Sequence, residues 1–513
     1  MPEARKEISP KHKGNNGSRE PVRKNQEASV NNTSGVKRWI GIFGGLMVFI
    51  IMLLSGAPEG LSREGWNTAA VASLMAVWWI SEVIPIPVTA LLPLVLFPLF
   101  GISDITATAV PYANPMIFLF MGGFIIAIAM QEWNLHRRVA LNIISVIGSK
   151  PKSIILGFMI SAAFMSMWVS NTAATMMMLP IALSVIDLTS REDHGTEARL
   201  QYRNFAVVLM LSIAYSANVG GLGTVIGTPT NALLIGFVSQ SYGVEISFVE
   251  WMMIGIPLVI FGLPVIFFSL TTLTYPVRFK SLPGGREYIE REVKGLGKFS
   301  RQEMLVAFVF VLAALLWITR PFLGIFIPGI SDAGIAIFGA LLLFLIPADW
   351  REGRFLLSWK AAARLPWGVL ILFGGGLTLA GAIQRTGLAE WVGGYFTVLG
   401  GLPFVMVIFI VAGVVIFFTE LASNSATAAA FLPVMGSVAI GMGQDPLFLA
   451  IPVAVSASCA FMLPVATPPN AIVYGSGMMS IPQMVRAGLW LNLFFTALIT
   501  IITKYLVPLI LGI

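Results

Sequence analysis

Charged residues are scarce in this sequence. Asp, Glu, Lys and Arg make up 11% of its 513 residues, compared with roughly 25% in soluble globular domains. Apolar residues make up 57% of the chain, and the mean hydropathy is +0.84. A chain with so little polar surface does not dissolve as a globular protein, so the composition indicates a polytopic protein of the lipid bilayer.

Cysteine and histidine are almost absent, which excludes several kinds of site. Cys459 is the single cysteine, so a disulfide within the chain and a thiolate metal site are both excluded. We interpret Cys459 as a small apolar packing residue. The three histidines, His12, His136 and His194, are too scattered for a metal or relay site. The apolar segments also contain no aspartate pair for proton coupling.

A signal-peptide pattern is lacking at the start of the chain. Residues 1–38 are polar, with nine basic and four acidic side chains, and we expect them to form a disordered cytoplasmic tail. The net charge of +7 arises from this tail and a few loops. Positive charge in a tail and in loops is explained by membrane topology. It therefore gives no reason to expect a nucleic-acid partner, and we expect none.

Long apolar runs predict the membrane spans, since about 20 apolar residues cross a bilayer. We expect an all-α fold with eleven spans and two re-entrant helical hairpins, at residues 153–186 and 403–435. Two of the spans, 205–236 and 447–474, are interrupted by Gly-Thr-Pro-Thr-Asn and Ala-Thr-Pro-Pro-Asn, where proline cannot continue a helix. The continuous spans lie near residues 39–54, 67–84, 88–100, 116–130, 251–273, 304–318, 334–346, 368–383 and 487–511.

The distribution of positive charge supports a topology with termini on opposite sides of the membrane. Loops assigned to the cytoplasm contain Arg and Lys clusters, at residues 191–203, 278–301 and 351–364, whereas the outer loops 101–112, 242–250, 393–402 and 436–446 contain none. Arg63 and Lys504 are the exceptions. The positive-inside rule therefore predicts a cytoplasmic N-terminus and an extracellular C-terminus.

Two polar tetrapeptides stand in the middle of the predicted hairpins. The first is Ser170-Asn171-Thr172-Ala173, and the second is Ser423-Asn424-Ser425-Ala426. An unsatisfied hydroxyl or amide group is costly in lipid, so polar residues at such depth mark a cavity, a ligand path or a helix contact. We call these two segments the first tip and the second tip, and we expect them to form one ion and substrate site.

The tips belong to a longer internal repeat. They lie 253 residues apart, and a glycine-rich segment that begins at Phe120 recurs at Phe373 with the same offset. In the predicted topology residues 39–275 and 304–513 are inverted repeats, joined by a cytoplasmic linker at 276–303. Paired halves with broken helices are typical of secondary transporters that bind their substrate at the membrane midplane.

The tips suit both a cation and an anion. A hairpin tip leaves backbone carbonyls and amides free, and these suit a hard cation and a carboxylate respectively. Asn171 and Asn424 can offer an oxygen to the cation and an NH2 group to the anion. No Arg or Lys lies in either tip or either break, so an anionic substrate would depend on dipoles, hydroxyls and co-bound cations, which favours coupling to sodium.

Several alternatives stay open. Glu420, three residues before the second tip, has either a structural or solvated role or a proton-linked one. Gly122, Gly123 and Gly374–Gly376 are interpreted as sites of close helix packing or of a break inside a membrane helix; a phosphate loop is disfavoured because no strand precedes them and no lysine follows. An intramembrane enzyme or a channel is a weaker interpretation, since nothing resembles a nucleophile with its base.

At these motifs the sequence resembles the divalent anion/sodium symporter family, and in particular its bacterial sodium-dependent dicarboxylate transporters. The resemblance covers nearly the whole chain after the tail. It rests on segments that include Val169-Ser-Asn-Thr-Ala-Ala-Thr, Ile226-Gly-Thr-Pro, Thr419-Glu-Leu-Ala-Ser-Asn and Met462-Leu-Pro-Val-Ala-Thr-Pro-Pro-Asn. It implies a plasma-membrane homodimer in which a transport domain moves against a scaffold as an elevator.

The resemblance also implies a set of ligands. The first sodium site would use Ser166, Ser170, Asn171 and Gly227, and the second would use Thr419, Ser423, Asn424 and Ala466. The substrate carboxylates would bind Asn171, Thr172, Thr228, Pro229, Asn424, Ser425, Thr467 and Pro468. Ser425 stands where the family often has threonine, which leaves four-carbon dicarboxylates and bulkier anions both open. The expected function is sodium-driven uptake of succinate, fumarate or malate, with a sodium-independent dicarboxylate exchanger as the alternative.

Overall fold

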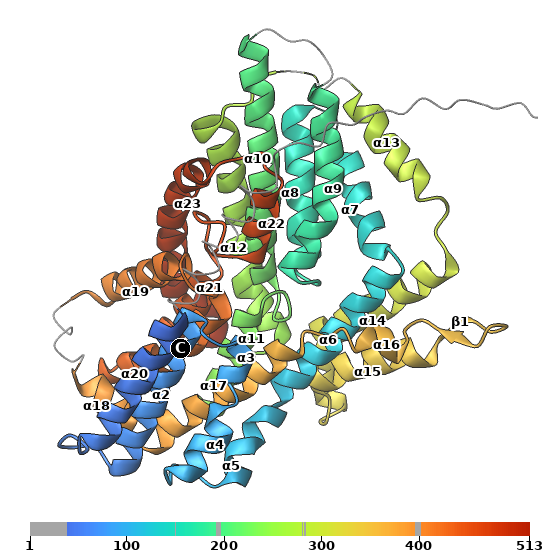
Figure 1. The fold of residues 1–513 in the computed structure, drawn as a ribbon. Helices are drawn as coiled ribbons and strands as arrows, with labels where there is room; N and C mark the ends of the chain where they lie inside the picture. Colours follow the sequence, from blue (N-terminus) through green and yellow to red (C-terminus); the bar gives the residue numbers. More distant parts are fainter. Residues whose placement is uncertain (1–37, 149, 191–195, 280, 282–283, 396–401) are drawn as a thin grey trace, which may run out of the picture.

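The computed structural model describes residues 38–148, 150–190, 196–279, 281, 284–395 and 402–513, and these residues are almost entirely helical (Figure 1). The predicted tail at residues 1–38 lies outside the described residues except for its last position. A short two-stranded ribbon, β1 (Pro347–Asp349) with β2 (Arg354–Phe355), is the one sheet among the described residues. The expectation of an all-α fold is therefore met apart from this ribbon.

The first repeat begins with helix 38–54 and α2 (Arg63–Ser81). The helices that follow in this repeat are α3 (Ile86–Thr89), α4 (Leu92–Leu99), α5 (Ile105–Ala109), α6 (Pro115–Glu132), α7 (Leu135–Ile147), α8 (Pro151–Ser166), α9 (Asn171–Ser190), α10 (Thr196–Gly220), α11 (Pro229–Tyr242) and α12 (Phe248–Phe268). The linker contains α13 (Gly285–Gly295).

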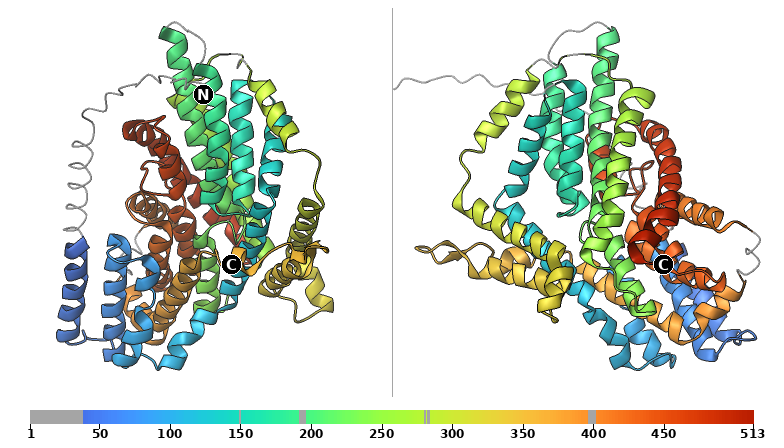
Figure 2. Two further views of the ribbon diagram at one scale, coloured as in Figure 1. Left: turned by 45° about the vertical axis from the view of Figure 1, so that its right-hand side comes forward. Right: turned by 180° about the vertical axis from the view of Figure 1, so that it is seen from behind.

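The helices after the linker belong to the predicted second repeat. Its helices are α14 (Arg301–Phe326), α15 (Asp332–Leu345), α16 (Trp359–Ala362), α17 (Trp367–Arg385), α18 (Leu388–Tyr395), α19 (Phe404–Thr419), α20 (Asn424–Gly441), α21 (Leu447–Ala457), α22 (Pro468–Gly475), α23 (Ile481–Ile501) and α24 (Val507–Leu511). The segment of residues 38–100 and the pair α14–α15 lie at opposite edges of the molecule, with α10 between them (Figure 2).

Both predicted breaks are present. Helix α10 ends at Gly220, the 3-10 turn Gly221–Gly223 follows, and α11 begins at Pro229. In the second repeat α21 ends at Ala457 and α22 begins at Pro468. Proline is well placed as the first residue of a helix, because its missing N–H would have no helical partner there. Each break therefore ends one helix and starts another, as predicted.

The two repeats interlock around α10. Helix α22 of the second repeat packs against α9 and α10, while α11 of the first packs against α17, α20 and α21 (Figure 1). The apolar part of α10 is completely enclosed by the protein, whereas α14 is mostly exposed on the outside of the bundle. The core of the molecule thus lies where the broken helices cross.

The helix boundaries differ from the expected spans in several places. Among the described residues, seven helices are long and apolar enough to cross a membrane, and shorter apolar helices account for most other predicted spans. The predicted span 88–100 is divided between the end of α3 and α4, and proline stands at the second position of each helix, as Pro87 and Pro93. The amphipathic helix α7 was not among the predicted elements. The number of eleven spans therefore stays a prediction.

The glycine clusters pack closely against other helices, as expected. A Cβ atom on Gly122 would lie 2.5 Å from the backbone carbon of Ala336, and one on Gly375 would lie 2.1 Å from the carbonyl oxygen of Ala90. Any side chain at either position would push two backbones apart. Cys459 is fully buried, in agreement with a packing role.

One positive charge on the predicted outer side was overlooked in the sequence. Arg320, in the last part of α14, lies beside Asp332 at the start of α15, with 3.3 Å between Nη1 and Oδ2. The same Asp332 oxygen accepts a hydrogen bond from the backbone N–H of Phe248 at 3.1 Å. Arg320 is therefore a further exception to the expected charge distribution, because the positive-inside rule counts Lys and Arg and not the net charge.

Candidate functional site

The first tip joins α8 to α9. Ser166 is the last residue of α8 and Asn171 is the first residue of α9. The Ser166 hydroxyl donates a hydrogen bond to Oδ1 of Asn171 at 2.6 Å, and the Ser170 hydroxyl accepts one from the backbone N–H of Ala173 at 3.3 Å. The asparagine side chain is thereby oriented by the helix that precedes it.

The second tip repeats this arrangement. Thr419 ends α19 and Asn424 begins α20. The Thr419 hydroxyl lies 2.9 Å from Oδ1 of Asn424 and 2.9 Å from the carbonyl oxygen of Ala457, so it can donate to either oxygen. The same spacing of five residues therefore orients both tip asparagines, and the second tip also contacts the end of α21.

A second pair of asparagines supports the two breaks, and the sequence analysis did not include them in the site. Nδ2 of Asn231 donates to the carbonyl oxygens of Gly221 at 3.1 Å and Thr224 at 2.8 Å. Nδ2 of Asn470 donates to those of Ala460 at 3.2 Å and Leu463 at 3.1 Å. Both asparagines stand in the repeated Thr-Pro-X-Asn motif, which was the signal available in the sequence.

The two breaks also contact each other across the repeats. Asn218, near the end of α10, donates through Nδ2 to the hydroxyl of Thr467 at 3.1 Å. Ser458, just after α21, lies 2.7 Å from the hydroxyl of Thr230 and 3.4 Å from that of Thr228. Each repeat therefore holds the start of the other repeat's short helix, which keeps the predicted ligands in one place.

One cavity of about 760 Å³ is lined by both tips and both breaks. Twelve of the fourteen predicted site residues line it: Ser170, Asn171, Thr172, Gly227, Thr228, Pro229, Ser423, Asn424, Ser425, Ala466, Thr467 and Pro468. Ser166 and Thr419 do not line the cavity, because they are fully buried behind the tips and act on the two asparagines. The structure thus brings together residues from four separate segments.

Part of the cavity lining comes from residues that the predicted topology assigns to the cytoplasmic side. Glu82, Gln131, Arg364 and Pro366 form part of its lining. Arg364 forms an ion pair with Glu132 at the end of α6. The absence of Arg and Lys from the tips and breaks holds, but the sequence analysis missed this arginine because it belongs to a loop far from both motifs.

At the first tip two neutral oxygen atoms approach Gly221 closely. A Cβ atom on Gly221 would lie 2.5 Å from Oδ1 of Asn171 and 3.1 Å from the carbonyl oxygen of Gly227. A glycine at this position keeps open the space between two oxygen acceptors. Hydroxyl, amide and carbonyl oxygens suit a hard cation. The described residues contain no cluster of three His, Cys, Asp or Glu side chains that would suit a transition metal.

Glu420 has the structural environment of a buried support. Its side chain is 3% exposed, and its carboxylate accepts hydrogen bonds from the backbone N–H groups of Phe461, Met462 and Leu463. Asn492 of α23 donates to the same carboxylate at 2.9 Å. Between the two roles left open, the structure favours the structural one, although the group is buried rather than solvated.

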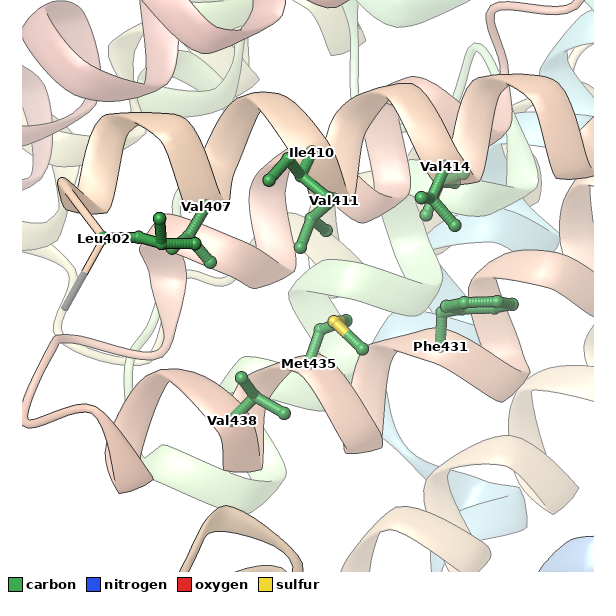
Figure 3. Close-up of a pocket in the computed structure, with 9 residues that line it drawn as sticks. Leu402, Val407, Ile410, Val411, Val414, Phe431, Met435 and Val438 are labelled. Atoms are coloured by element: carbon green, nitrogen blue, oxygen red, sulfur yellow. The ribbon is translucent and has the colours of Figure 1, made fainter. Parts of the chain in front are cut away.

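A separate apolar pocket lies between the two helices of the second hairpin. Its volume is about 220 Å³, and Val407, Ile410 and Val414 of α19 face Phe431 and Met435 of α20 across it (Figure 3). Every side chain in its lining is apolar. It cannot bind a dicarboxylate, so the polar cavity is the candidate site for transport.

The chain is similar to a described protein family and to known transporters. A family model described as the sodium:sulfate symporter transmembrane region matches residues 36–511. The sodium-dependent dicarboxylate transporter SdcS of Staphylococcus saprophyticus is 43% identical over 487 residues, which cover 94% of each chain. SdcS of Staphylococcus aureus is 44% identical over 478 residues, which cover 92% of each chain.

A solved structure shows a related fold. The YdaH transporter of Alcanivorax borkumensis matches with a TM-score of 0.56 and 14% sequence identity, covering 77% of this chain and 86% of that chain. At this level of identity the likeness bears on the fold alone. It indicates that the helical arrangement described above is one already observed in a membrane transporter.

Proposed function

The chain belongs to the sodium:sulfate symporter family, the divalent anion/sodium symporters, and from this premise we propose that it is a sodium-coupled symporter of four-carbon dicarboxylates. Membership in a family of transporters excludes the intramembrane enzyme. The observation that carries the proposal is the convergence of both tips and both breaks on one cavity. Succinate, fumarate and malate are the proposed substrates.

The first sodium site is proposed at Ser166, Ser170, Asn171 and Gly227, and the second at Thr419, Ser423, Asn424 and Ala466. The oxygen-lined space kept open by Gly221 supports the first site. The paired contacts of Thr419 with Asn424 and Ala457 support the second. All of these ligands are neutral, so the bound cations supply positive charge that the tips and breaks lack.

The substrate carboxylates are proposed to bind between the cations. One carboxylate would be bound by Asn171 and Thr172 and the other by Asn424 and Ser425, with Thr228, Pro229, Thr467 and Pro468 behind them. Helices α11 and α22 begin at Pro229 and Pro468, and the free backbone N–H groups of a helix N-terminus favour an anion. Sodium and dicarboxylate would then stabilise each other in one site, which is the physical basis of symport.

The proposed transport cycle is an elevator movement in a homodimer of the plasma membrane. The transport domain would contain both hairpins and both broken helices, and the remaining helices would form the scaffold. If the N-terminus is cytoplasmic, Glu82 and Arg364 line the cavity on its cytoplasmic side. The conformation described here would then be open to the cytoplasm. An outward-open conformation would complete the cycle.

Uptake of labelled succinate into proteoliposomes tests the proposal. We expect accumulation against a gradient only when sodium is directed inward, and we expect fumarate and malate to compete. Accumulation that requires internal dicarboxylate and ignores sodium would establish the exchanger instead. Absence of uptake under both conditions, with protein that is folded and reconstituted, would reject transport of these substrates.

A further inference from the structure

The Glu420 carboxylate is the charged group that holds the second tip against the second break. Its Oε1 accepts from the N–H groups of Phe461 at 2.7 Å and Met462 at 2.8 Å, and its Oε2 accepts from Leu463 at 2.9 Å. Oε1 also accepts from Nδ2 of Asn492 at 2.9 Å. An ionised carboxylate has only acceptors, so four donors around it match the charged form.

Three of these donors belong to the segment that shapes the proposed second sodium site. Residues 461–463 lie between α21 and α22, and the hydroxyl of Tyr215 donates to the Phe461 carbonyl in the same segment. Thr419, the residue next to Glu420, lies 2.9 Å from the carbonyl oxygen of Ala457 and from Oδ1 of Asn424. Glu420 therefore fixes the tip and the break relative to each other at the point where the cation ligands meet.

The first repeat has no charge at the corresponding position. Met167 occupies it, 253 residues before Glu420. The Met167 methyl carbon lies 2.9 Å from where a Cβ atom on Gly223 would be, so this side chain packs on the first break as Glu420 contacts the second. The first break contains Gly221, Gly223 and Gly227, whereas the second has Ala460, Met462 and Ala466 in the equivalent places.

From this difference between the repeats we propose that Glu420 is a positioning residue that preorganises the second sodium site and favours a cation there. The inference rests on the proposed function and assigns unequal roles to its two cation sites. A buried negative charge attracts a cation more strongly than it would in water, because the surrounding dielectric is low. The first site lacks such a charge and would depend on the substrate carboxylate.

The test measures sodium binding without transport and without dicarboxylate. The thermal unfolding midpoint of the purified full-length protein is recorded while sodium chloride replaces choline chloride at constant ionic strength. A ligand that binds the folded protein raises the midpoint in a concentration-dependent way. We expect Glu420→Gln to raise the sodium concentration for half of the effect by roughly tenfold, as loss of charge-assisted hydrogen bonds predicts.

Two further variants separate positioning from general stability. Glu420→Asp keeps the charge and should shift the sodium dependence less than Glu420→Gln. If Glu420→Gln does not fold, the sodium dependence of Glu420→Asp is compared with that of the wild type instead. Glu303→Gln is the matched control, because Glu303 is also a buried carboxylate but pairs with Arg138 away from the tips. We expect Glu303→Gln to lower the unfolding midpoint while its sodium dependence stays at the wild-type value.

Each result has one meaning. If the wild-type protein is not stabilised by sodium at all, the proposed sodium coupling fails and the inference fails with it. If the wild type responds but both Glu420 variants keep its sodium dependence, the role of Glu420 is overturned and the proposed function stands. An equal shift in Glu303→Gln would also overturn it, since any loss of a buried carboxylate would then have the same effect.

Discussion

Ser166 and Asn171 are joined by a hydrogen bond of 2.6 Å across the first tip, and Thr419 and Asn424 are joined by one of 2.9 Å across the second. Neither hydroxyl lines the cavity, yet each is placed to fix the direction of an amide that does. The tips thus have an outer layer that lines the cavity and an inner layer behind it that orients the two asparagines.

Ser166→Ala tests the inner layer. Removing the hydroxyl leaves the Asn171 amide without its oriented partner, and one hydrogen bond of this kind contributes about 1 kcal/mol. We therefore expect the sodium concentration for half-maximal uptake to rise by about fivefold, with the maximal rate retained at saturating sodium. Sodium-dependence curves of succinate uptake measure this. A lowered maximal rate with unchanged sodium dependence would place Ser166 outside the cation site.

Gly221→Ala tests the space for the cation at the first tip. The added methyl group would lie 2.5 Å from Oδ1 of Asn171 and 3.1 Å from the Gly227 carbonyl oxygen, so one of these acceptors must move. We expect a loss of apparent sodium affinity of at least roughly tenfold, the effect of removing one bond to a charged group. Gly475→Ala is the control, because its methyl group would meet nothing within 4 Å. Wild-type sodium dependence in Gly221→Ala would move the first cation site elsewhere.

The sequence predicted the tips and breaks well because they combine two local signals. Polar residues inside apolar runs and Thr-Pro pairs inside helices are both costly in lipid. Because both features occur twice in the chain, they indicate which individual residues belong to a functional site. Ser170, Asn171, Thr467 and Pro468 could be placed on this basis, and the structure brings them to one cavity.

Other parts of the site depend on contacts between distant segments, which a single sequence does not show. Arg364 lines the cavity from a loop whose positive charge is explained equally well by membrane topology. Asn218 meets Thr467 across 249 positions of the chain, and nothing in its neighbourhood distinguishes it from a packing residue. The short helices α3 and α4 were missed because a run of apolar residues with internal prolines has the composition of one span.

The predicted topology can be tested at Ser281, an exposed residue of the linker. Cys459 is first replaced by alanine, and a cysteine is then introduced with Ser281→Cys. We expect an impermeant thiol reagent added to intact cells to leave this cysteine unmodified, and to label it once the membrane is opened. Labelling in intact cells would reverse the topology, and the cavity would then open to the outside.

Thr172→Ala should separate the substrate from the cation. Thr172 lines the cavity, but it belongs to none of the proposed sodium ligands. Loss of its hydroxyl removes one donor to a carboxylate, which is worth about 1.5–3 kcal/mol. We expect the apparent succinate affinity to fall by roughly tenfold or more, while sodium binding measured without succinate is unchanged. Sodium-dependent unfolding midpoints and succinate saturation curves, measured on the same preparation, distinguish the two effects.

Asn171→Ala and Asn424→Ala test the central claim that one amide serves both ligands at each tip. Each substitution removes an oxygen that accepts the cation and an NH2 group that donates to a carboxylate. Bonds to charged groups contribute about 1.5–3 kcal/mol each, and tenfold in affinity is about 1.4 kcal/mol. We expect either variant to weaken apparent succinate affinity at fixed sodium by at least tenfold, and to shift the sodium dependence as well, because linked ligands affect each other reciprocally. If folded Asn171→Ala transported with wild-type dependence on both ligands, the tips would be packing elements and the site would lie elsewhere.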